Sequence, residues 1–131
     1  KANHSPSRDD IYFYPHTNHP DYFYGIADIF LLSSNYEGWG MTILESLKKN
    51  NIIVMTDVGC AGELIINDVN GCVVDVGNKE QMSEKLRQVI ESDDFRFKIK
   101  HGTSMVRFEK YSEEVYLIEY KRYFSSLLIK K

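Results

Sequence analysis

The sequence predicts an α/β protein in which helices flank a parallel β-sheet. Three short apolar runs, rich in β-branched residues, are expected to be buried strands: Ile29–Leu32, Ile52–Met55 and Cys72–Asp75. Each run is followed by a polar or glycine-containing turn and then by a segment that can form a helix. This alternation is typical of parallel strands joined by crossover connections.

Two elements are expected ahead of the first buried strand. Ile11–Tyr14 is a strand candidate that Pro15 stops, and a short helix can open between Asn18 and Asp21 and end near Ala27. Residues 1–10 are polar and rich in turn formers, so we expect a loose leader followed by one domain over residues 11–131.

The middle of the chain predicts a helix, a strand and a compact turn region. Met41–Lys49 is expected to be an amphipathic helix that Asn50 and Asn51 end, with an apolar face made of Ile43, Leu44 and Leu47. After the second buried strand, we expect a short helix around Glu63–Ile66 and a turn at Asn67–Gly71.

The last part of the chain is predicted to be helical. Asn78 and Gln81 form an N-cap pattern for a helix to about Glu91, whose inward side chains are Met82, Leu86 and Val89. Helical spacing also defines a second apolar face, made of Phe95, Ile99, Gly102 and Val106. Ser112 can cap a final helix with an apolar stripe of Leu117, Tyr120, Phe124 and Leu127. This stripe either packs into the core, which is the simpler reading, or docks against a domain absent from this chain.

Composition excludes several classes of function. A length of 131 residues allows one domain with a real core, and a net charge of −3 argues against nucleic acid as the main partner. No apolar run approaches the roughly 20 residues needed to span a bilayer. Cys60 and Cys72 are too few for a disulfide framework, which indicates reduced thiols and a cytoplasmic location.

The stretch Asp28–Leu47 carries the strongest functional signal. Its apolar run leads into a glycine-rich loop, residues 33–40, and then into the start of a helix. A helix N-terminus offers free N–H groups and partial positive charge, which suit phosphates. Glu37 lies in the loop and Glu45 about a turn inside the helix. Carboxylates in these places can accept hydrogen bonds from sugar hydroxyls, so the stretch predicts a nucleotide-sugar site.

Two other kinds of chemistry have weaker support. His16 and His19 have neither a nearby cysteine nor a third ligand, so we favour an ordinary loop over a metal site there. Cys60 lies in a glycine-containing turn, but no histidine partner for a nucleophile is apparent.

The segment EGWGMTILESL resembles the E-x7-E motif of retaining glycosyltransferases of family 4, also called group 1, which have the GT-B fold. Four flanking segments are similar, in the same order, to that family's neighbouring strands, turn and helices: ADIFLLSS, IIVMTDVGCAGELI, NGCVVDVGNKEQMSEKL and KYSEEVYLIEYKRYF. The resemblance covers roughly residues 11–124. It implies a Rossmann-like parallel sheet that forms part of the C-terminal, donor-binding half of a GT-B fold.

The resemblance implies roles for particular residues. Glu37 would hydrogen-bond the donor sugar and Glu45 the ribose hydroxyls, as the two acids central to catalysis; alternatively both are solvated surface acids. Trp39 either flanks the sugar or packs under the loop. Glu63 either belongs to the donor site or is an acid whose negative charge is favourable in the first turn of a helix. The backbone amides expected at the sugar and diphosphate are those of Gly38, Gly40, Met41 and Thr42. Main chain near Tyr14–His16 is expected at the nucleobase.

The implied reaction transfers a sugar from a nucleoside-diphosphate sugar to an acceptor with retention, without a metal or other cofactor. Complete enzymes of this family have an N-terminal acceptor domain and two further strands that open the donor domain. None of these precedes Ile11 in the sequence, so we expect this chain to be a fragment, inactive alone. In the family's sheet order the missing strands would lie between those at Ile11 and Ile29. Peripheral membrane association of the complete enzyme is compatible with this, and the oligomeric state stays open. The alternatives are a non-enzymatic interaction module and, ranked lower, a nucleotide-sugar 2-epimerase.

Overall fold

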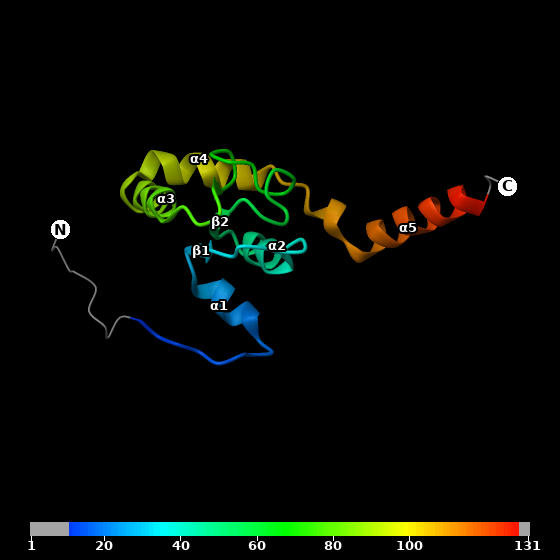
Figure 1. The fold of residues 1–131 in the computed structure, drawn as a ribbon, viewed down its shortest axis with the longest axis horizontal. Coiled ribbons are helices and arrows are strands. Elements are labelled where there is room, and N and C mark those ends of the chain that lie inside the picture. The colour runs from blue at the N-terminus through cyan, green and yellow to red at the C-terminus, as the bar shows by residue number, and fades with distance from the viewer. Residues whose placement is uncertain (1–10, 129–131) are drawn as a thin grey trace.

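The computed structural model describes residues 11–128, so the expected leader lies outside the described residues. The elements, shown in Figure 1, are α1 (Pro20–Ile26), β1 (Ile29–Leu32), α2 (Met41–Lys48), β2 (Ile52–Thr56), β3 (Cys72–Val74), α3 (Lys79–Glu91), α4 (Asp93–Ser104), the 3-10 helix η2 (Phe108–Tyr111) and α5 (Glu113–Leu128). With the corrections given below, these elements follow the predicted order.

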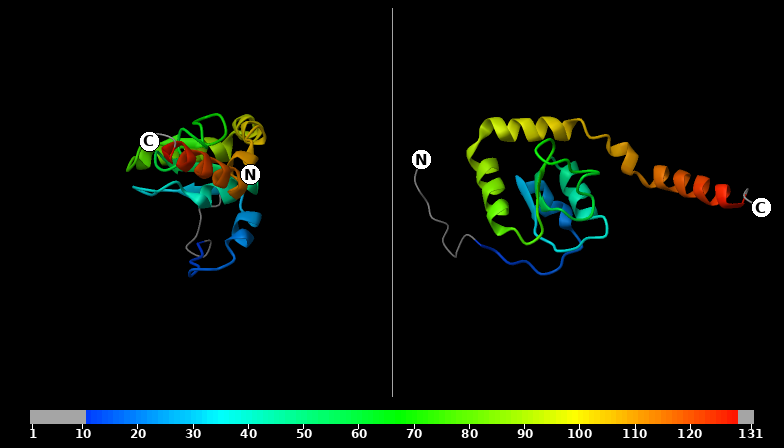
Figure 2. Two further views of the ribbon diagram at one scale, coloured as in Figure 1. Left: turned by 90° about the vertical axis from the view of Figure 1, so that its right-hand side faces the viewer. Right: turned by 45° about the horizontal axis from the view of Figure 1, so that its top comes forward.

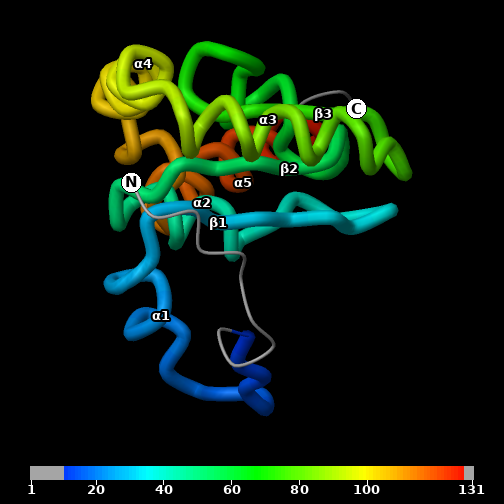
Figure 3. Tube along the Cα trace, turned by 90° about the vertical axis from the view of Figure 1, so that its left-hand side faces the viewer, coloured from blue at the N-terminus to red at the C-terminus, as the bar shows by residue number. Residues whose placement is uncertain are grey.

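The three strands form one parallel sheet in the order β1-β2-β3. Ile29 lies opposite Ile52, and Val54 lies opposite Cys72. Figure 3 shows α3 and α4 above β1 and β2, and α1 below these two strands. The predicted α/β fold class with a Rossmann-like parallel sheet is therefore confirmed.

The central strand β2 supplies both halves of the core, because every one of its residues is buried. Successive side chains of a strand point to opposite faces. Ile53 and Met55 accordingly belong to one apolar cluster, and Ile52 and Val54 to another. The helices add residues to these clusters, α2 to the first and α3 and α4 to the second: Ile43, Leu44, Leu47, Val89 and Ile99.

Helix α4 runs close to the turn that precedes β3. A Cβ atom on Gly102 would lie only 2.0 Å from the carbonyl oxygen of Val69. Next to it, the Thr103 hydroxyl donates a hydrogen bond of 3.2 Å to the carbonyl of Asn70. The predicted inward position of Gly102 is thus explained, because only a residue without a side chain allows this approach.

The prediction of a strand at Ile11–Tyr14 is wrong. All of its side chains are exposed, and Phe13 is 93% exposed. A strand needs a partner for its backbone hydrogen bonds, and the strand pairings in the described part of the chain join only β1, β2 and β3. In Figure 1 this segment, in dark blue, runs apart from the sheet.

The short helix predicted around Glu63–Ile66 is also wrong. The carbonyl of Cys60 accepts hydrogen bonds from the N–H groups of both Glu63 (3.2 Å) and Leu64 (2.9 Å), and Gly62 has a left-handed φ of 78°. The resulting tight turn buries Leu64 and Ile65 together in the core under α2. Two adjacent side chains point about 100° apart on a helix, so one helical turn would direct them less well to the same cluster.

Helix α5 projects away from the α/β body in Figure 1 and in the right-hand view of Figure 2. None of its residues is buried, and Phe124 of the predicted stripe is 58% exposed. The reading of this stripe as core packing is therefore wrong for the described residues. No helix among residues 11–128 has the length and apolar character that a bilayer crossing requires.

Candidate functional site

Two loops lie side by side where β1 and β2 end. The N–H of Cys60 donates to the carbonyl of Trp39 at 2.9 Å, and the Thr56 hydroxyl donates to the carbonyl of Ser34 at 2.6 Å. Gly59 has a left-handed φ of 56°, and a Cβ there would lie 2.6 Å from the Trp39 carbonyl oxygen. Two backbone carbonyls of the loop of residues 33–40 are therefore hydrogen-bonded, one to the end of β2 and one to the loop that follows β2.

Glu37 and Gly38 are neighbours in this loop and differ in exposure. The half-buried Glu37 accepts a 2.7 Å hydrogen bond from the Ser34 hydroxyl through Oε1. Gly38 is exposed, and a Cβ on it would meet nothing within 4 Å. The protein's own packing thus gives no reason for glycine at position 38, which leaves room for the close ligand approach predicted there.

Helix α2 begins without a side-chain cap. Its N-cap residue is Gly40, whose φ of 91° is left-handed, and no side chain accepts a hydrogen bond from the first turn. A Cβ on Gly40 would lie 2.7 Å from Cδ1 of Ile43. Met41 and Thr42, which follow, are exposed. An uncapped helix start carries free donors and partial positive charge, which is an arrangement suited to an anion.

Glu45 is half-buried on α2. It follows Thr42 by three positions and Met41 by four, so the three share one side of the helix. Its neighbour across the helix pair is Tyr24 of α1, which is buried. Burial raises the pKa of the Tyr24 phenol, and the nearby carboxylate of Glu45 raises it further.

Trp39 and Glu63 are brought together although 24 positions separate them. The indole Nε1 of Trp39 donates to Oε2 of Glu63 at 3.2 Å. The other neighbour of the indole is Tyr111 of η2, with ring centroids 5.3 Å apart. Burial raises the pKa of Tyr111, and the charge of Glu63 adds to that rise. Trp39 thus has packing and hydrogen-bond contacts within the protein. The alternative prediction, that Trp39 flanks the donor sugar, stays a prediction.

Sequence reasoning did not single out Tyr111, Tyr24 or Ser34. Tyr111 contacts Trp39 although the two residues are far apart in the sequence, and no local pattern marks the contact. The Ser34 hydroxyl lies three residues before Glu37, so its bond to the carboxylate could have been anticipated as a local side-chain turn.

A cavity opens at the carboxyl ends of β1 and β2, against the start of α3. Hydroxyl, amide and ammonium groups line it: Ser33, Asn35, Thr56, Asn78, Lys79 and Ser83. Met82 and Leu86 add apolar walls, and none of the predicted donor-site residues is among the side chains that line this cavity. The carboxyl ends of the strands are where open parallel sheets bind their ligands.

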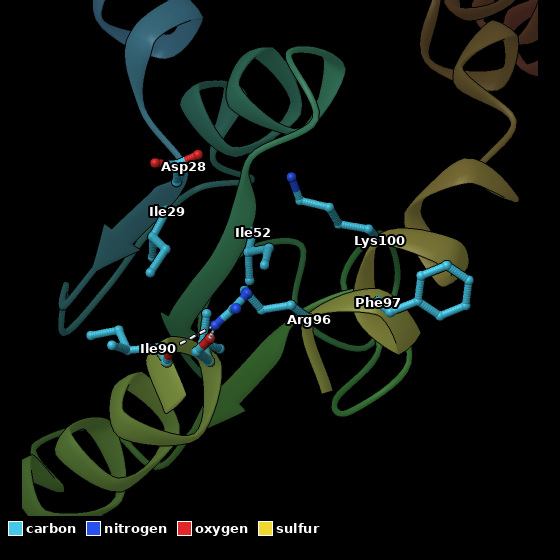
Figure 4. A pocket seen from close by; sticks show the side chains of 8 residues that line it. Asp28, Ile29, Ile52, Ile90, Arg96, Phe97 and Lys100 are labelled. Atoms are coloured by element: carbon cyan, nitrogen blue, oxygen red, sulfur yellow. Dashed lines mark hydrogen bonds between the residues drawn. The ribbon is translucent and has the colours of Figure 1, made fainter. Parts of the chain in front are cut away.

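A second cavity lies at the opposite, amino end of the sheet, as Figure 4 shows. Its floor is apolar, with Ile29 and Ile52 at the starts of β1 and β2. Two cations line the cavity, Arg96 and Lys100. Arg96 donates through Nη1 to the carbonyls of Val89 (2.8 Å) and Ile90 (2.6 Å), so it caps the C-terminal end of α3.

Cys60 and the two histidines bear on the weaker alternatives. The Cys60 thiol is fully buried, and burial raises its pKa to about 11. It stays protonated at neutral pH and is poorly suited to act as a nucleophile. Among residues 11–128, which include His16 and His19, no three side chains of His, Cys, Asp or Glu gather into a group that could hold a metal.

Comparison with known proteins finds glycosyltransferases both by sequence and by structure. The chain is 23% identical over 113 residues to the capsular polysaccharide biosynthesis glycosyltransferase CapM of Staphylococcus aureus, covering 86% of this chain and 30% of CapM. The C-terminal domain of the glycosyl transferase group 1 protein LpcC of Francisella tularensis superposes with a TM-score of 0.66 and 28% identity, covering 79% of this chain and 53% of that one. S. aureus TarM, solved with UDP among its ligands, superposes with a TM-score of 0.76 at 21% identity over 88% of this chain and 24% of TarM.

These matches bear on the extent of the chain as well as on its family. Three of the curated relatives are covered over only 19% to 30% of their length. The model of one family, described as glycosyl transferases group 1, matches residues 2–105, which is most of the chain. The protein therefore belongs to the group 1 glycosyltransferase family.

Proposed function

We propose that this chain is the donor-binding portion of a family 4 glycosyltransferase, which transfers a sugar from a nucleoside-diphosphate sugar with retention of configuration. The observation that carries the proposal is the uncapped N-terminus of α2, which opens beside the glycine-rich loop after β1 with Glu37 and Glu45 on either side of it in sequence. Family membership and the UDP bound by TarM support this choice of ligand.

In this proposal each group has a separate task. The amides of Met41 and Thr42 bind the diphosphate, and the Glu45 carboxylate accepts from the ribose hydroxyls. Glu37 accepts from hydroxyls of the donor sugar, and the backbone at Gly38 and Gly40 approaches the same sugar. Trp39 completes the donor-binding set, to which Glu63 belongs through its hydrogen bond with the indole of Trp39.

The chemical step breaks the bond between the anomeric carbon and the diphosphate oxygen and forms a bond from that carbon to a hydroxyl oxygen of the acceptor. The proton of that hydroxyl passes to the leaving diphosphate. Free N–H groups at the helix start stabilise the negative charge that develops on the leaving diphosphate. We propose that neither a metal nor another cofactor is required. An N-terminal acceptor domain selects the acceptor, and the enzyme works in the cytoplasm, where peripheral association with a membrane is compatible with it. Alone, the chain binds donor weakly and turns over little.

Isothermal titration of the chain with UDP-glucose and GDP-mannose tests the proposal. We expect binding of at least one of them, weakened about tenfold or more in Glu45→Ala, because a hydrogen bond to a charged acceptor contributes about 1.5–3 kcal/mol. Glu91→Ala is the matched control, since Glu91 is exposed at the end of α3 and follows Ile90, which lines the cavity at the amino end of the sheet. Binding that is equal in wild type and Glu45→Ala would contradict the assignment of Glu45.

The exposed α5 favours one alternative, a non-enzymatic interaction module. That function predicts no binding of either nucleotide sugar together with tight self-association in sedimentation experiments. The same two measurements therefore separate it from a donor site.

A further inference from the structure

We propose that Glu63 and Tyr111 are positioning residues that hold Trp39, and through Trp39 the loop of residues 33–40, in the conformation that binds the donor. The inference rests on the proposed function. It assigns Glu63 a role through Trp39 instead of a direct contact with the sugar, and it adds Tyr111.

The first observation is that Trp39 stands between two glycines that have no side chains to anchor the loop. Gly38 has no neighbour within 4 Å of its Cβ position, and Gly40 is left-handed at the start of α2. Glycine leaves a backbone free to adopt many conformations. Trp39 is therefore the one large side chain that can fix the loop between Glu37 and α2.

The second observation is that three groups from elsewhere in the chain hold Trp39. Glu63 accepts from the indole nitrogen at 3.2 Å. Tyr111 packs on the ring at 5.3 Å between centroids, with the planes inclined by 44°. Cys60 donates its backbone N–H to the Trp39 carbonyl at 2.9 Å. Side chain and backbone of one residue are thus tied to the loop after β2 and to η2.

The third observation is that these contacts join separate parts of the chain. Glu63 lies in the turn between β2 and β3, and Tyr111 lies in η2, directly before α5. An aromatic pair and a charge-assisted hydrogen bond both depend on geometry. A displacement of η2 would therefore change the position of the Trp39 side chain and the backbone conformation of the neighbouring glycines.

Trp39 is the single tryptophan of the chain, so tryptophan fluorescence reports on the surroundings of this one side chain. Two substitutions at the exposed Glu63 separate the roles. Glu63→Gln keeps an oxygen that can accept from the indole N–H, whereas Glu63→Leu removes the acceptor at similar size. Thermal unfolding followed by circular dichroism checks that both variants are as stable as wild type. Glu91→Leu is the matched control for a lost surface carboxylate.

For Glu63→Leu we expect a shift of Trp39 emission and weaker binding of UDP-glucose or GDP-mannose, whichever binds the wild type, by about three- to tenfold. For Glu63→Gln we expect binding within about twofold of wild type. In a Trp39→Phe background, Glu63→Leu should cause no further loss, because the partner N–H is gone. Tyr111→Phe should keep binding, and Tyr111→Leu should weaken it about two- to tenfold.

Three results would overturn the inference. In the first, Glu63→Gln binds as weakly as Glu63→Leu while the emission of Trp39 is unchanged, which means that the carboxylate meets the donor itself. In the second, Glu63→Leu changes the emission but binds like wild type. In the third, Glu63→Leu leaves the emission unchanged, so the contact does not hold Trp39. If the wild type binds neither nucleotide sugar, the proposed function fails, and the inference fails with it.

Discussion

Replacing Gly102 by alanine tests the close approach of α4 to the turn before β3. In an ordinary helix interior this change stabilises by up to about 1 kcal/mol. Here the added Cβ would lie 2.0 Å from the carbonyl oxygen and 2.7 Å from the carbonyl carbon of Val69. Both are backbone atoms and cannot rotate away, so α4 or the turn must move by about 1 Å or more to reach an ordinary contact. Overpacking of this kind costs about 1–3 kcal/mol.

We therefore expect Gly102→Ala to lower the free energy of unfolding by up to about 2 kcal/mol after the gain in helix propensity is deducted. Urea unfolding followed by circular dichroism measures it, and the slope with denaturant should not change. Gly25→Ala in α1 is the control, because nothing lies within 4 Å of its Cβ position and its stability should stay the same or rise. A Gly102→Ala midpoint at or above the wild-type midpoint would refute the reasoning.

Two further predictions concern stability. Burial raises the pKa of both Cys60 and Cys72 to about 11 from an ordinary value of 9.0, so the stability gained from the neutral thiols is complete below pH 9 and is lost as pH rises from 9 to 11. We expect a loss of about 2–3 kcal/mol per thiol in urea titrations over that range, and a Cys72→Ala variant with an equally steep loss would contradict it. Asn78→Ala removes the oxygen that accepts from the Gln81 N–H at 3.0 Å and should cost about 1 kcal/mol of unfolding free energy, whereas Asn78→Ser should retain most of it.

The elements that the sequence predicted well are those whose signals are local. The runs Ile29–Leu32 and Ile52–Met55 are apolar enough to be strands in any α/β arrangement, and both are confirmed. The N-cap at Asn78 depends only on Gln81, three residues on, and the structure has that bond.

The failed predictions depended on neighbours that local pattern cannot identify. Ile11–Tyr14 has the composition of a strand but no strand beside it among the described residues. The turn at Glu63–Ile66 is decided by Gly62 and by the need to bury two adjacent apolar residues. The contacts of Trp39 reach Glu63 and Tyr111 from distant turns, so they required the fold itself.

The placement of β2 between two apolar clusters has a consequence for unfolding. Ile53 and Met55 belong to the cluster under α2, and Ile52 and Val54 to the cluster under α3 and α4, although all four are consecutive in one short strand. Neither side of the sheet can come apart while the other stays intact, because releasing β2 from one helix layer removes it from the other as well. The α/β body should therefore lose its order in a single step, and the β2 amides should be among the last to exchange with solvent deuterium.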